Sequence, residues 1–158
     1  MFYRFRYEAE FYPTLSRLPL DVRRKLDVTG LQVSLNDWQA FSLEERGVLC
    51  HLPVDLIDEK QVFVAYVDFL SRHYQGKPAK TTEPMDASLW SSAQVPEPVA
   101  QKSASVSDPI GVDEWRTWQE HQRYALYKSA LSKNQPEAFI AVLDELRASL
   151  GRRAQADD

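Results

Sequence analysis

The chain has 158 residues, of which 27% are charged and 44% hydrophobic, and its formal net charge is −4. This balance is typical of a globular protein, and the negative charge argues against a basic surface for nucleic acid. The single cysteine, Cys50, cannot form an internal disulfide, and the longest apolar run, Val62 to Val67, is too short to span a bilayer. We therefore expect a cytoplasmic protein that binds neither nucleic acid nor a membrane.

The first predicted elements are two strands with a helix between them. From Tyr3 to Phe11 apolar and polar residues alternate, which is the period of a strand with one buried face. Residues 31–35 alternate in the same way, so we expect this N-terminal strand and the residues near 31–35 to form a two-stranded sheet. Between them, Pro19 and Gly30 mark the start and the end of a helix.

Two short helices and one long helix are expected next. Ser34 with Asp37, and Ser42 with Glu45, have the spacing of N-terminal capping boxes. The segment 56–75 carries a broad apolar arc, so we expect it to be the central core helix. The arc consists of Val62, Phe63, Tyr66, Val67, Phe69, Leu70, His73 and Tyr74.

The segment 77–111 contains five of the nine prolines and six serines and has almost no periodicity, which predicts an irregular path. Helices are expected at 113–132 and 136–150, with a flexible tail over 152–158. The predicted fold class is therefore mainly α, a single compact helical domain over 1–151 with a minor two-stranded sheet. We find no internal repeat in the sequence.

The polar residues do not form a pattern typical of catalysis. Cys50 and His51 are adjacent, and neighbours on a helix point about 100° apart, so we interpret Cys50 as a buried structural thiol. The three histidines lack the short spacing of a metal site, and the five glycines are too far apart to hold a phosphate. We expect no catalytic residue, no metal and no cofactor.

Two groups of residues are candidates for contact with a partner. The run Arg23, Arg24 and Lys25 concentrates positive charge, and it is either a solvated helix face or a contact with an anion or a partner. In the helix 113–132, Trp118 lies on one side and Tyr124 and Tyr127 lie nearly opposite. Such a helix is either buried between neighbours or presents one side to another protein.

Several ordered blocks resemble the conserved nitrate reductase-associated protein family. They are Phe5-x-Tyr7-Glu8-x-x-Phe11, Leu18-Pro19-Leu20-x-Val22-Arg23-x-Lys25-Leu26-Asp27, Gly30-Leu31-x-Val33-x-Leu35-x-x-Trp38 and Trp118-x-x-x-Gln122-Arg123-Tyr124-Ala125-Leu126. The resemblance implies a partnership rather than a reaction, because the family is associated with assimilatory nitrate reductase and with genes for its molybdopterin cofactor, and has no established catalytic residues.

We therefore expect a non-catalytic accessory protein that docks on a molybdenum-dependent assimilatory nitrate reductase, or on the machinery that inserts its molybdenum cofactor, and supports its maturation or activity. The expected docking residues are Arg23, Arg24, Lys25, Trp118, Arg123, Tyr124 and Tyr127. The alternative is a small-molecule-binding protein or an enzyme with a pocket between the helices 56–75 and 113–132. Its lining would be Tyr66, His73, Trp118, His121 and Arg123. The sequence leaves the oligomeric state open.

Overall fold

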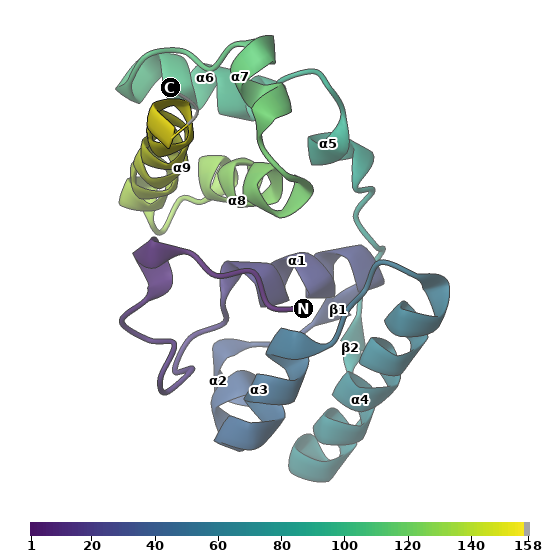
Figure 1. The fold of residues 1–158 in the computed structure, drawn as a ribbon. Coiled ribbons are helices and arrows are strands. Elements are labelled where there is room, and N and C mark those ends of the chain that lie inside the picture. Colours follow the sequence, from purple (N-terminus) through teal and green to yellow (C-terminus); the bar gives the residue numbers. More distant parts are fainter. Residues whose placement is uncertain (157–158) are drawn as a thin grey trace. The chain divides into compact units, whose positions relative to one another are not determined.

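The computed structural model describes the backbone of residues 1–156 and the side chains of residues 1–151. Over this range the chain forms nine α-helices and one two-stranded sheet, which confirms the predicted fold class (Figure 1). The chain divides into two compact units: unit 1 comprises residues 1–4 and 8–86, and unit 2 comprises residues 5–7 and the chain from Ala87 onward. The expectation of a single domain over 1–151 stays a prediction.

Unit 1 contains four α-helices and both strands among its described residues. A 3-10 helix over Arg6–Glu8 precedes them. The elements are α1 (Leu20–Thr29), β1 (Leu31–Gln32), α2 (Leu35–Ala40), α3 (Leu43–His51), α4 (Ile57–Gln75) and β2 (Lys80–Thr81).

The starts of α2 and α3 follow from local sequence. The Ser34 hydroxyl accepts a hydrogen bond from the Asp37 amide at 3.0 Å, and the Ser42 hydroxyl accepts one from the Glu45 amide at 3.1 Å. In each case the acidic side chain accepts the amide hydrogen of the capping serine in return. Both predicted capping boxes are confirmed.

The small sheet differs from the prediction in one strand. β1 pairs antiparallel with β2, so that Leu31 lies opposite Thr81, and the expected N-terminal strand over residues 3–11 does not form. Gly30 makes this pairing possible: its φ is 74°, and a Cβ atom there would lie 2.5 Å from the carbonyl oxygen of Thr82. The strand that pairs with β1 therefore comes from the segment that we expected to be irregular.

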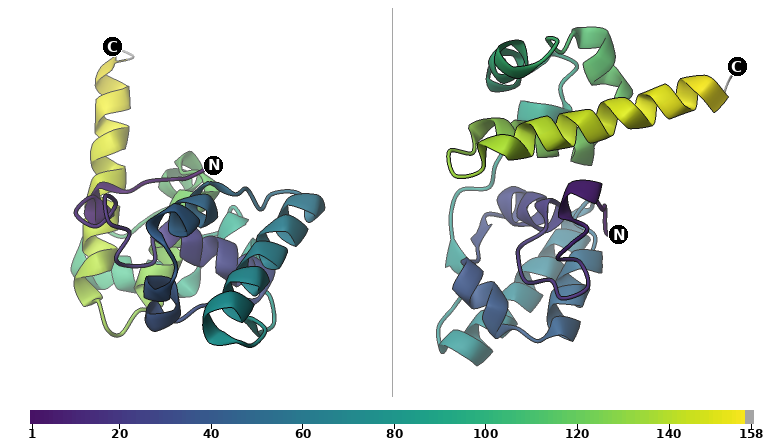
Figure 2. Two further views of the ribbon diagram at one scale, coloured as in Figure 1. Left: turned by 90° about the horizontal axis from the view of Figure 1, so that it is seen from below. Right: turned by 90° about the vertical axis from the view of Figure 1, so that its left-hand side faces the viewer.

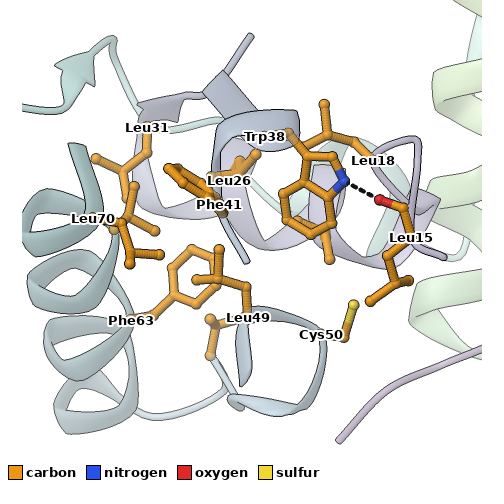
Figure 3. Close-up of a cluster of buried hydrophobic side chains, with 13 residues drawn as sticks. Leu15, Leu18, Leu26, Leu31, Trp38, Phe41, Leu49, Cys50, Phe63 and Leu70 are labelled. Carbon is orange, nitrogen blue, oxygen red and sulfur yellow. Dashed lines mark hydrogen bonds between the residues drawn. The ribbon is translucent and has the colours of Figure 1, made fainter. Parts of the chain in front are cut away.

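The hydrophobic core of unit 1 is built from α1, α2, α3 and α4 together with the loop before α1 (Figure 3). Trp38 is fully buried, and its indole N–H donates to the Leu15 carbonyl oxygen at 2.7 Å. Leu49, Phe63 and other large buried side chains belong to the same cluster. Burial of each such side chain contributes about 1.5–3 kcal/mol relative to exposure, so this cluster supplies much of the stability of unit 1.

Unit 2 is helical throughout its described elements, and α5, α6 and α9 all pack against α8. The elements are α5 (Ser88–Ser91), α6 (Glu97–Val106), α7 (Val112–Thr117), α8 (Glu120–Leu131) and α9 (Pro136–Ala156).

The irregular path predicted for residues 77–111 is wrong in part, because this segment contains β2, α5 and α6. Pro96 and Pro98 do not interrupt α6. They occupy its N-cap and first turn, where the missing amide hydrogens would have no helical partner. The prolines therefore mark the start of a helix.

The helix expected at 136–150 is confirmed as α9, which runs beyond Gly151 to Ala156 (Figure 2). Of its predicted apolar face, Phe139, Val142, Leu143 and Leu146 are buried. The flexible tail predicted over 152–158 lies outside the residues whose side chains are described, and residues 157–158 lie outside the described backbone.

Units 1 and 2 repeat the same succession of helices at a spacing of 77 residues, so the expectation of no internal repeat is wrong. The first and last residues of α1 lie 77 positions before those of α6, and the same holds for α2 and α7. The first residues of α3 and α8 are also 77 positions apart. Few residues are identical at equivalent positions. The cap residues are an example, since Ser42 is the N-cap of α3 and Gln119 is the N-cap of α8.

The same two side chains hold the equivalent corner in each unit. The Trp38 indole donates to the carbonyl of residue 15, and the Trp115 indole donates at 3.0 Å to that of residue 92, which is again 77 positions later. Arg46 and Arg123 each donate to three carbonyl oxygens, two at the end of the preceding helix and one in a segment earlier in the chain. The acceptors are Thr14, Trp38 and Gln39 for Arg46, and Ser91, Trp115 and Arg116 for Arg123.

Candidate functional site

The basic run on α1 points in two directions. Arg23 is exposed, whereas Arg24 and Lys25 are buried, and Lys25 has no exposed surface. Their expected docking role stays a prediction, although burial leaves little of Arg24 and none of Lys25 at the surface of unit 1.

Asp21 is the centre of a buried charge cluster on α1. Its carboxylate lies 2.9 Å from the Arg24 guanidinium and 3.5 Å from Lys25 Nζ, and it accepts the Tyr3 amide at 3.1 Å. Lys25 also donates to the carbonyl oxygens of Met1 and Cys50. Burial lowers the pKa of Lys25, while the charge of Asp21 opposes that shift. The cluster ties the N-terminal segment and the end of α3 to α1.

Glu8 is a buried carboxyl group that the strand pattern assigned to the solvent side. Both of its oxygens accept the Leu20 amide, at 2.9 and 3.2 Å, and one accepts the Tyr12 hydroxyl at 3.0 Å. It therefore caps the first turn of α1 from twelve residues away. Burial raises the pKa of Glu8 to about 7, while its hydrogen bonds from Leu20 and Tyr12 lower it.

The aromatic helix predicted at 113–132 is two helices, α7 and α8, with Trp118 between them. Trp118 is buried edge-on against Trp115, with ring centroids 6.3 Å apart, and Arg123 is bound to three carbonyl oxygens. Of the two alternatives for these residues, burial is the one observed. The expected docking roles of Trp118 and Arg123 stay predictions, and in this structure Arg123 braces the corner through those three hydrogen bonds.

The two tyrosines of α8 lie beside Trp90. Tyr124 is buried with its ring centroid 5.0 Å from that of Trp90, and Tyr127 is half-buried at 5.8 Å. The expected docking role of Tyr124 stays a prediction, although its side chain is buried in unit 2. Of the seven expected docking residues, Arg23 is exposed and Tyr127 is half-buried. The other five are buried or, in the case of Arg123, bound to the corner.

The pocket that we considered as an alternative draws its lining from both units. Tyr66 and His73 belong to unit 1, while Trp118, His121 and Arg123 belong to unit 2. That pocket stays a prediction.

Cys50 is confirmed as a buried structural thiol. It has no exposed surface, and burial raises its pKa to about 12, so the thiol stays protonated at neutral pH. The Nδ1 atom of the adjacent His51 lies 2.8 Å from the Gly47 carbonyl oxygen, one turn earlier in α3. Among the residues with described side chains, we find no group of three or more His, Cys, Asp or Glu placed to hold a metal ion.

The largest departure from the sequence prediction lies on α4, the expected core helix. Phe63, Val67 and Leu70 are buried as predicted, but Val62 is 56% exposed and Phe69 is 59% exposed. The spacing of Val62, Tyr66, Phe69 and His73 puts them on one side of the helix. We call these four residues the α4 face. Phe69 stacks on His73 with ring centroids 6.2 Å apart, so an ordered aromatic surface is open to solvent.

Comparison with known proteins identifies one family. The family model described as conserved nitrate reductase-associated protein matches residues 4–146. No curated protein and no solved structure matches the chain. Separately, within the described part of the chain no helix is long and apolar enough to cross a membrane.

Proposed function

Because the chain belongs to the conserved nitrate reductase-associated protein family, we propose that it is a non-catalytic accessory protein that docks on a molybdenum-dependent assimilatory nitrate reductase. In this proposal it acts in the cytoplasm and supports the maturation or the activity of the reductase. The family assignment supports the association with the reductase, and the geometry of unit 1 supports docking as its mode.

The observation that carries this proposal is the α4 face. An exposed Phe and Val at helical spacing leave apolar area in water, and covering each of them would contribute about 1.5–3 kcal/mol. Aromatic side chains also dominate the binding energy of protein interfaces.

Three buried or half-buried polar side chains support a non-catalytic role, because each is hydrogen-bonded to backbone groups. Lys25 binds two carbonyl oxygens, Glu8 binds the start of α1, and Arg123 binds the end of α7. The one thiol is kept in its unreactive protonated form by burial.

A pull-down with purified assimilatory nitrate reductase tests the proposal. The Val62→Asp/Phe69→Asp double variant should bind the reductase at least about tenfold more weakly, because two exposed apolar contacts are replaced by charges. The matched control is Leu131→Asp/Ile140→Asp, which makes the same change at two exposed apolar residues of unit 2 and should bind normally.

Three results would contradict the proposal. The native chain could fail to retain the reductase, the α4 double variant could bind as well as the native chain, or both double variants could lose binding equally. A parallel pull-down that retains a purified molybdenum-cofactor insertion protein, when the reductase is not retained, would overturn the choice of partner.

A further inference from the structure

The space beside the tryptophan corner is filled with aromatic rings in unit 2. Trp90 packs edge-on against Tyr124 at a centroid distance of 5.0 Å and lies 5.8 Å from Tyr127. Trp90 and Tyr124 are almost completely buried. In unit 1 the positions 77 residues earlier carry small side chains, and these residues are Pro13, Gly47 and Cys50.

These three residues line one pocket of unit 1, with a volume of about 340 Å³. Leu15 and Cys50 are buried residues of its lining, and Phe2 and Tyr12 contribute aromatic rings that meet edge to face at 5.4 Å. A Cβ atom added at Gly47 would meet nothing within 4 Å. Since small-molecule pockets start at about 300 Å³, this volume suits one aromatic ring system.

We propose that this pocket, which we call the aromatic pocket, receives a Trp or Tyr side chain from a segment of a partner protein. Unit 2 fills the equivalent space with an indole that the short helix α5 presents. In unit 1 the equivalent residues 11–14 form turns, and the position equivalent to Trp90 is Pro13, which carries no aromatic ring. A ring from another chain would restore the packing that unit 2 achieves by itself.

The rim of the pocket indicates which residues flank that ring. Arg4 is exposed, and its guanidinium lies 5.2 Å from the centroid of the Phe2 ring. His51 also packs against Phe2, with ring centroids 5.6 Å apart. The positive charge of Arg4 favours an Asp or Glu beside the aromatic residue of the partner. The inference does not rest on the proposed function, because it fixes the chemistry of the segment and not the identity of the protein.

Titration of the ¹⁵N-labelled full chain by NMR tests the aromatic pocket. The probes are N-acetyl-tryptophanamide, N-acetyl-Asp-Trp-amide and, as an apolar control, N-acetyl-leucinamide. Both tryptophan probes should cause saturable shifts of the amide signals of Gly47, Cys50 and His51. The Asp-Trp probe should bind several-fold more tightly than N-acetyl-tryptophanamide, and in Arg4→Gln the two tryptophan probes should bind with equal affinity.

Gly47→Tyr places in unit 1 the side chain that unit 2 has at Tyr124, and it should abolish binding of both tryptophan probes. Val48→Tyr adds the same side chain at the next position of α3, which is 41% exposed and outside the pocket lining, and it should bind normally. The proposal would be overturned by probes that shift none of the three amides at millimolar concentration, by leucine binding equal to tryptophan binding, or by loss of binding in Val48→Tyr. If Gly47→Tyr does not fold, the N-acetyl-leucinamide control and the Arg4→Gln variant still test the proposal.

Discussion

Unit 1 and unit 2 hold an equivalent corner with equivalent residues, but they differ in what surrounds it. Trp38 and Arg46 in unit 1 make the same bonds to backbone carbonyls as Trp115 and Arg123 in unit 2. Beside that corner, Trp90 fills the space in unit 2, while unit 1 leaves a pocket. The shared residues therefore identify the scaffold, and the residues that differ identify the surfaces available for binding.

The comparison predicts that the two corner tryptophans are equally important. Trp38→Ala and Trp115→Ala each remove a fully buried indole and leave a backbone carbonyl without its donor, so each should lower the free energy of unfolding by about 3–5 kcal/mol. Urea denaturation followed by circular dichroism measures both losses. A loss below about 1 kcal/mol for either variant would break the equivalence of the two corners.

Glu8 gives unit 1 a pH dependence. Its folded pKa of about 7 lies above the ordinary 4.5, so the stability that it contributes is complete below pH 4.5 and is lost as the pH rises to 7. Relative to Glu8→Gln, which does not titrate, the native chain should lose about 3 kcal/mol between pH 4.5 and pH 8.

Urea denaturation of the native chain and Glu8→Gln at pH 5 and pH 8 measures this difference. The control is Glu10→Gln, which changes an exposed carboxylate two residues away and should leave the pH dependence intact. A native chain whose stability relative to Glu8→Gln is the same at both pH values would show that Glu8 is not held as a buried acid.

The two arginines should tolerate lysine equally poorly. Lysine keeps the charge but not the planar fork that binds three carbonyl oxygens, so Arg46→Lys and Arg123→Lys should each cost about 2 kcal/mol. Arg72→Lys is the control, because Arg72 forms an exposed ion pair with Asp68 and its change should cost less than about 0.5 kcal/mol. Chemical denaturation would expose any inequality between the two corners.

The smallest predicted change in stability concerns Gly47, which lines the aromatic pocket of unit 1 where unit 2 has the buried Tyr124. Gly47 lies inside α3 with room for a Cβ atom, so Gly47→Ala should stabilise the chain by about 0.5–1 kcal/mol. The equivalent Tyr124→Ala should destabilise it by several kcal/mol, because a buried ring is removed. Thermal unfolding of the two variants should shift in opposite directions, and a shift of both in the same direction would contradict this.

Signals that act within one turn of a helix could be predicted from the sequence. Both serine capping boxes and the stop of α1 at Gly30 depend on residues at most four positions apart, and all of them are confirmed. The N-terminal strand was predicted wrongly because its alternation is not caused by pairing. The buried Glu8 side chain accepts the Leu20 amide hydrogen. An alternating pattern of polar and apolar residues cannot predict a partner twelve positions away.

The docking residues were harder to predict because their burial depends on distant backbone. Lys25 donates to the carbonyl oxygens of Met1 and Cys50, which lie 24 and 25 positions away in the sequence. No local sequence pattern predicts these partners. The exposed α4 face was missed for the opposite reason, since Val62 and Phe69 have the spacing of core residues. The repeat was not predicted because it consists of equivalent helix positions and equivalent side-chain bonds to backbone. The residues at equivalent helix caps differ, so the sequence alone does not show it.

Hydrogen–deuterium exchange of the chain with and without purified assimilatory nitrate reductase tests the central claim of docking most directly. We predict slower exchange over residues 57–75 of α4 when the reductase is present, with unchanged exchange over residues 136–150 of α9. Unchanged exchange of α4 in the presence of saturating reductase would contradict the account.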